Sequence, residues 1–385
     1  MSTRPPQRQR STIPEYSATG DVLAYRTCAL QYRFYNRNRL PPSRPVQIWF
    51  GEFIHGVLEE AFRRWKTEHP PFPWKWLDHI RPIELALNKE LLARGIPDPP
   101  GIFCRFENSR ENYRGNCPDH EHPHKLLASQ RVEAAINHLG PWLFPLISEA
   151  EVRLRGTRRL PQPSFRAEAY SVTGVADVLA TRHIDEHLLD MLPKTIRTVL
   201  SSLSRNAEII VDYKGTRRPA LDQPEWKAHE LQILTYAWLR NQQVGESRVE
   251  ACLLLYLNEL VPSRDDLVRL QQELLNNTTD VKPDGNDRVL IGAWGHDQAV
   301  PTLSPSFRLQ RCIRVIEASP NNIHEALHYF DNTVLEIEKK VQQEMLGAKI
   351  LENWDPRYRH ETCVACDFVP ICPHETVRER LARRG

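Results

Sequence analysis

Three charged side chains lie inside stretches of sequence that otherwise have the composition of buried strands. Asp177 lies in the apolar segment 174–179, and Asp212 and Lys214 end the apolar segment 208–214. Residues i and i+2 of a strand point to the same face, so Asp212 and Lys214 are expected to project together. Burying these charged side chains is unfavourable unless they are paired with each other or bind a cation. Carboxylates can hold a hard divalent ion, and a neighbouring lysine can activate water or stabilise a phosphoryl transition state. The simpler alternative is an ordinary Asp–Lys ion pair at a strand end, with Asp177 capping a turn.

Two predicted helices carry further polar side chains. His55 lies in the predicted helix 48–66. Gln232 and Tyr236 are spaced i, i+4 on the predicted helix 221–244, and they therefore share one helix face. Taken alone, a helical histidine is most often a satisfied interior or surface residue, and the second helix simply has a partly polar face.

Taken in order along the chain, these residues resemble the RecB-like branch of the PD-(D/E)XK nuclease superfamily. That family has a helical Gly-x-x-x-His, a strand ending in Asp, a second strand with (Asp/Glu)-x-Lys, and a helix with Gln-x-x-x-Tyr. The matching residues are Gly51, His55, Asp177, Asp212, Lys214, Gln232 and Tyr236. The resemblance implies an α/β fold with a restriction-endonuclease-like core, in which helices flank a mixed central sheet.

The resemblance also implies a role for each residue. Four groups would ligate Mg²⁺ or Mn²⁺: His55, Asp177, Asp212 and the backbone carbonyl of Tyr213. Lys214 would position the attacking water and polarise the phosphate. Gln232 and Tyr236 would contact DNA near the scissile phosphate, and with Asp177, Asp212 and Lys214 they complete the expected catalytic set.

Two features depart from the family pattern. Asp177 and Asp212 are separated by 34 residues, including a predicted helical insert at 184–204, where the family commonly has a short hairpin. The sequence also contains no G-x-x-x-x-G-K-[ST] phosphate-binding loop, so any coupling to ATP-driven unwinding would need another chain.

Three of the eight cysteines, Cys363, Cys366 and Cys372, have the spacing C-x2-C-x5-C. Cys28 is the natural candidate for a fourth ligand. Thiolates select zinc or an iron–sulfur cluster, and a zinc ribbon normally has two local cysteine pairs rather than this division of one plus three. The pattern resembles the iron–sulfur subgroup of RecB-like nucleases, which includes the AddB nuclease domain and the CRISPR spacer-acquisition exonucleases. That resemblance implies a [4Fe–4S] cluster, with zinc or no metal as the alternatives.

Such a cluster would join the helical N- and C-terminal segments, because Cys28 and Cys363 are 335 residues apart. Closing a loop of that length is worth about 5 kcal/mol in a chain-entropy model. A second group could bind zinc or could simply belong to a polar loop: Cys104, Cys117, His120, His122 and His124. Cys252 and Cys312 lie in apolar surroundings and are expected in the core.

The chain of 385 residues is 41% hydrophobic and 26% charged, so it can bury a substantial core. Its 51 Lys and Arg balance 49 Asp and Glu, and a basic surface must therefore be local. Residues 1–66 have such an excess, with eleven basic against five acidic side chains. The sequence has no membrane-spanning apolar run and no secretory signal, which favours a soluble cytoplasmic protein.

We expect four regions along the chain. They are a disordered tail (1–16), an N-terminal helical region with the first cluster cysteine and a long loop (17–145), the nuclease core (146–260) and a C-terminal helical region with three cluster cysteines (261–385). Strands are predicted at 149–154, 165–171, 174–180, 207–213 and 249–257, and helices at 18–37, 48–66, 125–139, 221–244 and 322–346.

The leading hypothesis is therefore a metal-dependent DNA nuclease that hydrolyses phosphodiester bonds and leaves a 5′ phosphate. Because no groove-reading motif is visible, an exonuclease on single strands or DNA ends is favoured, acting in repair, recombination or defence. DNA and a helicase or other nuclease-complex subunit are the expected partners. The alternatives are a non-catalytic DNA-binding or scaffold protein of a nuclease–helicase complex, and a zinc-binding interaction module.

Overall fold

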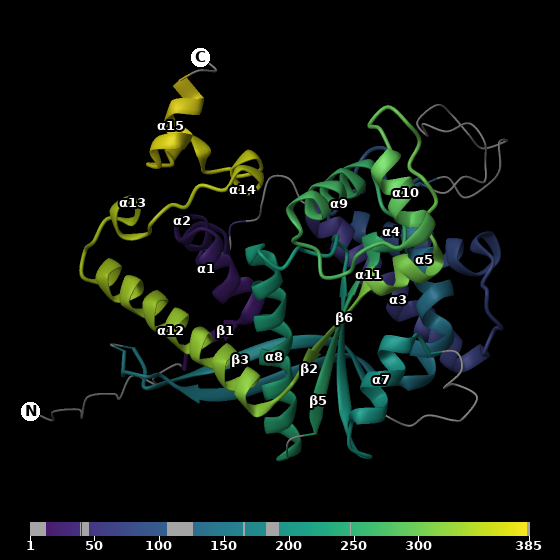
Figure 1. Cartoon of the computed structure of the whole chain (residues 1–385). Helices are drawn as coiled ribbons and strands as arrows, with labels where there is room; N and C mark the ends of the chain where they lie inside the picture. The colour runs from purple at the N-terminus through teal and green to yellow at the C-terminus, as the bar shows by residue number, and fades with distance from the viewer. Residues whose placement is uncertain are drawn as a thin grey trace, which may run out of the picture.

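The computed structural model describes residues 13–38, 40, 46–105, 126–164, 166–181, 192–246 and 248–382. The described chain forms an α/β fold in which helices cover both faces of one mixed β-sheet (Figure 1). In the view of Figure 1, α8 and α12 lie on one side of the sheet, and α3, α4 and α5 lie on the other.

Six strands make up the sheet, and they are β1 (Glu15–Ser17), β2 (Ile147–Arg159), β3 (Ala169–Thr181), β4 (Glu208–Lys214), β5 (Val249–Tyr256) and β6 (Ile313–Glu317). The order β1-β3-β4-β5-β6 has parallel β1–β3 and β4–β5 pairs, whereas β3–β4 and β5–β6 are antiparallel. The antiparallel partner β2 pairs along nearly the whole of β3. Strands β1 and β4 therefore pair with different parts of the opposite edge of β3.

One face of the sheet packs against an aromatic-rich helical layer. Its elements are α3 (Val46–Glu68), η3 (Trp76–Ile80), α4 (Arg81–Ala93), α5 (Leu127–Leu143), η5 (Phe144–Leu146) and α7 (Lys194–Ser202). Ile209 and Val211 of β4 and Leu253 and Leu255 of β5 point into this core. The period of two in these strands is what an apolar strand covered on both faces should show.

The other face packs against α8 (Pro224–Val244) and α12 (Pro320–Met345). Ile210, Cys252 and Leu254 are the intervening strand residues, and they contact this second core. The N-terminal segment packs here as well, as η1 (Ala18–Leu23), α1 (Ala24–Thr27), α2 (Ala29–Tyr32) and η2 (Arg33–Arg37). Both predicted helices of this layer, 221–244 and 322–346, are confirmed.

Helices after β5 complete the fold. The first group is η6 (Leu257–Glu259), α9 (Arg264–Asn276), α10 (Gly285–Ala293) and α11 (Pro305–Cys312), around a small core of its own. The last group is α13 (Ile350–Asn353), α14 (His360–Val364), η7 (Val369–Ile371) and α15 (Glu375–Ala382). No helix within the described ranges combines the length and the apolar character that a membrane crossing requires.

Several predicted elements differ from the observed ones. Segments 165–171 and 174–180 do not form two strands, because β3 runs without a break from Ala169 to Thr181. The predicted helix 18–37 is divided into four short segments. The break lies at Cys28, whose extended backbone (φ −160°, ψ 112°) separates α1 from α2.

The sheet also extends beyond the expected core region, since β1 and β6 come from outside residues 146–260. The predicted helices 48–66 and 125–139 are confirmed as α3 and α5, each with somewhat different ends. Of the predicted insert 184–204, α7 is helical, and residues 182–191 lie outside the described ranges.

Candidate metal centre

The centre of the site lies where β3 and β4 part. Their register pairs Val178 with Val211, and the ladder does not continue to the next pair, Asp177 and Asp212. Instead, the Oδ2 atom of Asp177 accepts a hydrogen bond from the backbone N–H of Tyr213 at 2.7 Å. The carboxylate thus satisfies a backbone donor that the sheet leaves unpaired, and its other oxygen remains available.

That other oxygen faces His55, which α3 brings across the end of the strands. Nδ1 of His55 lies 3.2 Å from Oδ1 of Asp177. The ring of Tyr213 packs edge-on against the imidazole, with centroids 6.2 Å apart. The structure therefore brings together two of the predicted ligands, one from a helix and one from the sheet.

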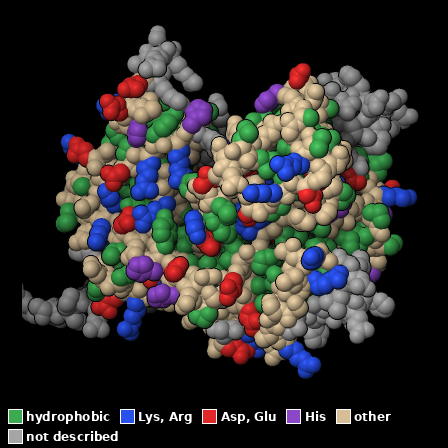
Figure 2. Space-filling model, viewed as in Figure 1, with side chains coloured by type: hydrophobic (Ala, Val, Ile, Leu, Met, Phe, Trp, Pro, Cys, Tyr) green, Lys and Arg blue, Asp and Glu red, His purple; other side chains and the backbone are tan. Residues whose placement is uncertain are grey.

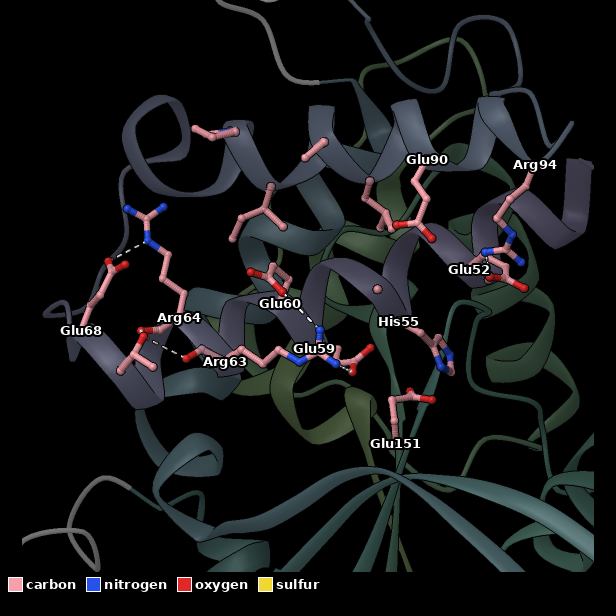
Figure 3. A pocket seen from close by; sticks show the side chains of 17 residues that line it. Glu52, His55, Glu59, Glu60, Arg63, Arg64, Glu68, Glu90, Arg94 and Glu151 are labelled. Carbon is pink, nitrogen blue, oxygen red and sulfur yellow. Dashed lines mark hydrogen bonds and ion pairs between the residues drawn. The ribbon is translucent and has the colours of Figure 1, made fainter.

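A third ligand, Glu151, completes the group and was missed from the sequence. One ligand atom each from His55, Glu151 and Asp177 lies within 4.8 Å of the others. Figure 3 shows His55 projecting from α3 towards Glu151, which rises from the sheet. The β2–β3 register, with Ala150 opposite Val178, sets Glu151 opposite Asp177.

The backbone of Glu151 is strained, with φ at 52° in the middle of a strand. A non-glycine residue in the left-handed region costs on the order of 1–2 kcal/mol, and such conformations gather at functional sites. Here the strain accompanies a carboxylate that is placed beside the Asp177 carboxylate. An arrangement with this cost fits a cation-binding role better than a purely structural one.

Protonation in the triad is shifted by burial and by the crowding of charges. Burial lowers the pKa of His55, but the adjacent Asp177 carboxylate outweighs burial and raises it to about 9. Burial and repulsion by Asp177 and Glu59 raise the pKa of Glu151 to about 7. Both shifts report a concentration of negative potential, which a bound divalent cation would relieve.

Asp212, the third predicted ligand, lies beside the triad and is held by other partners. Its carboxylate is 2% exposed and lies 2.6 Å from Nζ of Lys214. Burial raises its pKa despite this ion pair. The expected projection of Asp212 and Lys214 to the same face is confirmed by the contact. The carbonyl of Tyr213 as a ligand stays a prediction.

Gln232 links the predicted catalytic residues of β4 and α8. Its Oε1 atom accepts a hydrogen bond from Nζ of Lys214 at 2.6 Å, and its Nε2 atom donates to Asp212 at 3.2 Å and to the Tyr236 hydroxyl at 3.2 Å. The amide orientation is unambiguous, because an ammonium can only donate and a carboxylate can only accept. Gly174 makes room for this network, since a Cβ there would overlap the ring of Tyr236.

A groove of about 1100 Å³ opens onto the triad between α3 and α4 (Figure 3). It is lined by six glutamates and three arginines, which are Glu52, Glu59, Glu60, Glu68, Glu90, Glu151, Arg63, Arg64 and Arg94. The three arginines form ion pairs with glutamates inside the groove, as in Arg94–Glu52 at 3.0 Å. The groove therefore carries a net charge of −3 apart from His55, and we call it the acidic groove.

A second centre is formed by the predicted cysteines. Cys28, Cys363, Cys366 and Cys372 line one small pocket, together with Gln31 and Arg357 among others. All four are free of disulfides. Burial raises the pKa of Cys366 and Cys372, and repulsion by neighbouring thiolates adds to both shifts. Four thiols facing one enclosure are a donor set that calls for a cation or a cationic cluster.

The segment around the pocket is attached to the N-terminal helices through contacts of its own. The rings of Phe34 and Phe368 stack with centroids 4.6 Å apart, and the Tyr35 hydroxyl donates to Asp367 at 2.8 Å. The backbone N–H of Arg357 points to the Sγ atom of Cys28 at 3.5 Å. The break between α1 and α2 is therefore what aims Cys28 at the C-terminal cysteines.

The spacing of the thiols bears on which group would fit. Among the described residues, the triad is the single set of three or more His, Cys, Asp or Glu side chains with ligand atoms within 4.8 Å of one another. Sulfur atoms of a tetrahedral zinc site, with Zn–S bonds of 2.3 Å, lie about 3.8 Å apart. No three of the four cysteines meet the 4.8 Å criterion, so their thiols are not gathered as closely as in a mononuclear zinc site.

The remaining candidates have different outcomes. Cys104 is buried, and Cys117, His120, His122 and His124 lie outside the described residues, so the possible second zinc group is not tested. Cys252 and Cys312 are fully buried in the core, as predicted. A scan against protein-family models gives no match to this chain, and no curated protein matches it either.

Proposed function

We propose that the protein is a metal-dependent DNA nuclease with a restriction-endonuclease-like core. The observation that carries this proposal is the position of the His55–Glu151–Asp177 triad directly beside the Asp212–Lys214 pair. The triad is a ligand set for Mg²⁺ or Mn²⁺, and the pair adds a buried cation aimed at the same place. A metal site alone does not explain the lysine, and a structural ion pair alone does not explain the triad. Metal-dependent hydrolysis of a phosphodiester explains both.

Bound Mg²⁺ or Mn²⁺ would supply Lewis acidity and lower the pKa of a water ligand. The protein supplies the positioning. Lys214 is held by Asp212 and Gln232, and the third N–H of its ammonium would donate to the attacking water or to a phosphate oxygen. The Tyr236 hydroxyl keeps a free proton to donate to a backbone phosphate, because it accepts from Gln232. Hydrolysis in this arrangement breaks the P–O3′ bond and leaves a 5′ phosphate.

We further propose that the four cysteines hold a [4Fe–4S] cluster with a structural role. The pocket is lined by residues of the N-terminal helical segment and of the C-terminal segment, and the cluster would fix the one against the other. Soft thiolates lining one pocket, divided as one N-terminal and three C-terminal cysteines, support this identity.

The function is tested with protein purified without oxygen, on linear single-stranded, blunt duplex and circular DNA, with Mg²⁺, Mn²⁺ or EDTA. We expect metal-dependent degradation of linear DNA with circular DNA spared. Asp212→Asn should abolish cleavage, and Lys214→Ala should lower turnover by about 10² or more while Mn²⁺ affinity is nearly kept.

Glu151→Gln should weaken Mn²⁺ binding and cleavage together. The matched control is Glu149→Gln, because Glu149 lies two residues away on the same strand, is exposed and faces Arg240 at 3.9 Å. No metal-dependent degradation of any substrate by the wild type would refute the nuclease assignment, and full activity in Asp212→Asn would refute the role of Asp212. Cleavage of circular DNA would refute a pure exonuclease.

A further inference from the structure

The acidic groove is the largest opening at the metal centre, yet its charge is wrong for a nucleic acid. A DNA strand carries one negative charge per nucleotide, and a groove with a net charge of −3 repels it. The arginines of the groove do not change this, because each is paired with a glutamate. A substrate strand that reaches Lys214 must therefore extend in another direction.

A pocket of opposite charge lies on the far side of Lys214, at the β6 edge of the sheet. It has a volume of about 540 Å³ and is lined by Arg218, Lys282 and Arg314, with Asp280 as its single acidic residue. Its net charge is +2. Thr195, Trp226 and Gln310 add polar and aromatic surface, and we call the whole the basic pocket.

The buried Arg314 has hydrogen-bond donors that its neighbours in the protein do not fully use. The residue is 3% exposed and its guanidinium lies 4.3 Å from the centroid of the Trp226 ring. Its Nη2 atom donates to the Pro219 carbonyl at 2.8 Å and lies 3.2 Å from Asp280. Nε and Nη1 have no well-aligned acceptor among the described residues, and the Tyr256 hydroxyl lies close to the guanidinium. Asp280 already accepts hydrogen bonds from Nε and Nη2 of Arg218, so one carboxylate serves two guanidinium groups.

The basic pocket lies within reach of the metal centre. Register places Asp212 beside Leu254 and Leu254 beside Arg314 across β4, β5 and β6. Two strand spacings separate Asp212 from Arg314, which is roughly 10 Å. That is a separation a single strand covers in one or two nucleotides.

The surface between them is polar and is supplied by α8. His229 lies one turn before Gln232, and its Nδ1 atom is 3.1 Å from the Tyr256 hydroxyl. Burial together with the positive charges of Lys214 and Arg314 lowers the pKa of His229 to about 3, so this histidine is neutral between two cations. The first turn of α8, which contributes Trp226, lies at the upper end of that helix in Figure 1. In the same view, the surface is hollowed at the top between the C-terminal helices and α9, and Lys and Arg side chains lie on both sides of the hollow (Figure 2).

We propose that the basic pocket holds a phosphate of the substrate strand next to the scissile one, so that single-stranded DNA runs from Lys214 along α8 to Arg314, away from the acidic groove. This inference rests on the proposed nuclease function and assigns the direction of the strand. The ligand is a phosphate group, and its possible sources are a nucleic-acid strand or a free phosphate.

The test uses exposed residues, so that the fold is kept. Lys282→Glu is made in the Asp212→Asn protein, and binding of a labelled 12-nucleotide single strand is followed by fluorescence anisotropy over a range of salt concentrations. We expect about tenfold weaker binding. The slope of the logarithm of the binding constant against the logarithm of the salt concentration should become smaller by about one. Gln310→Glu, at the same pocket, should act in the same direction.

Two charge-reversal controls separate local from general effects. Lys349→Glu changes a lysine that is 79% exposed on its side chain and pairs with Glu352, so it should leave binding unchanged. Arg94→Glu changes the acidic groove, and it should also leave binding nearly unchanged. An effect of Lys349→Glu as large as that of Lys282→Glu, or a larger loss with Arg94→Glu, would overturn the proposed strand path.

Inorganic phosphate separates the two sources of the ligand. If phosphate raises the melting temperature of the wild type but not of Lys282→Glu, while DNA binding is the same in both, the pocket is a free-anion site and the strand path is wrong. If Lys282→Glu weakens DNA binding as expected but the wild type cleaves no DNA with either metal, the proposed chemistry fails while the binding path stands. If the wild type cleaves DNA and Lys282→Glu binds it normally, the path fails alone.

Discussion

The side chain of Asp177 accepts a hydrogen bond at 2.7 Å from the backbone N–H of Tyr213, 36 residues later in the chain. This contact fixes one carboxylate oxygen to the backbone of the strand that ends in Lys214. The second oxygen is thereby oriented towards His55 and Glu151 without help from a metal. The centre is preorganised by the sheet itself, which is the condition for low reorganisation cost on ion binding.

The contact predicts different results for two substitutions of Asp177. In Asp177→Asn the amide oxygen can still accept the Tyr213 N–H, so the melting temperature without metal should fall less than in Asp177→Ala. Mn²⁺ binding, measured by calorimetry, should be lost. Asp177→Ala should instead destabilise the protein by about 1–3 kcal/mol, because the buried N–H loses its acceptor. Equal stabilities in urea unfolding would contradict this account.

Gly174 should not tolerate a side chain. Its Cβ would meet the ring of Tyr236, which cannot move away without breaking its contact with Gln232. Gly174→Ala should therefore lower the free energy of unfolding by about 1–3 kcal/mol and reduce turnover with little change in Mn²⁺ affinity. Gly292→Ala is the control, since a Cβ there meets nothing within 4 Å and the change should be neutral or slightly stabilising. A wild-type turnover in Gly174→Ala would show that Tyr236 does not need its observed position.

The four cysteines should behave as one unit. Cys28→Ala and Cys363→Ala should each remove the brown colour and lower the stability by about 5 kcal/mol, and the double variant should be hardly worse than either alone. Cys252→Ala, in the core, should keep the full visible absorbance. Retention of the cluster in Cys28→Ala with its loss in Cys104→Ala or Cys117→Ala would move the site to the other Cys/His group.

Asp280 predicts a stability change at acidic pH. Burial raises the pKa of this carboxyl, but the hydrogen bonds and charge of Arg218, with the charge of Arg314, lower it to about 2. A folded-state pKa below the unfolded value of about 3.9 means that the contribution is complete above about pH 4 and is lost as the pH falls towards 2. The wild type should therefore exceed Asp280→Asn by about 2 kcal/mol in urea unfolding at pH 7, and the difference should vanish near pH 2. A difference that is independent of pH would show that the Arg218 pair contributes nothing through charge.

The elements nearest the site were predictable because their signals are local. Strands β4 and β5 are continuous apolar runs, and α8 lies between them in the chain with its polar residues one turn apart. The contact of Lys214 with Asp212 follows from the strand period alone. The meeting of Cys28 with the C-terminal cysteines followed from their spacing and the resemblance, not from any local rule.

The parts that were missed depend on register and on tertiary packing. Glu151 is an exposed glutamate in an alternating strand, and nothing nearby in the sequence distinguishes it from Glu149. Only the pairing of β2 with β3 sets it opposite Asp177. Arg217 and Arg218 come three and four residues after Lys214, and their ion pairs with Glu273 and Asp280 could not be read from the sequence because these partners lie about 60 residues later. Arg314 lies on β6, a short strand that gave no sequence signal.

Cys28 is made long before the other cysteines that line its pocket. This thiol is synthesised 335 residues before Cys363, and at about 5–20 residues per second a ribosome needs roughly 20–70 seconds to make the chain between them. Throughout that interval the extended residue between α1 and α2 presents an unpartnered thiol to the surrounding solution. Of the four cysteines, Cys28 therefore remains longest without its partners while the chain is being made.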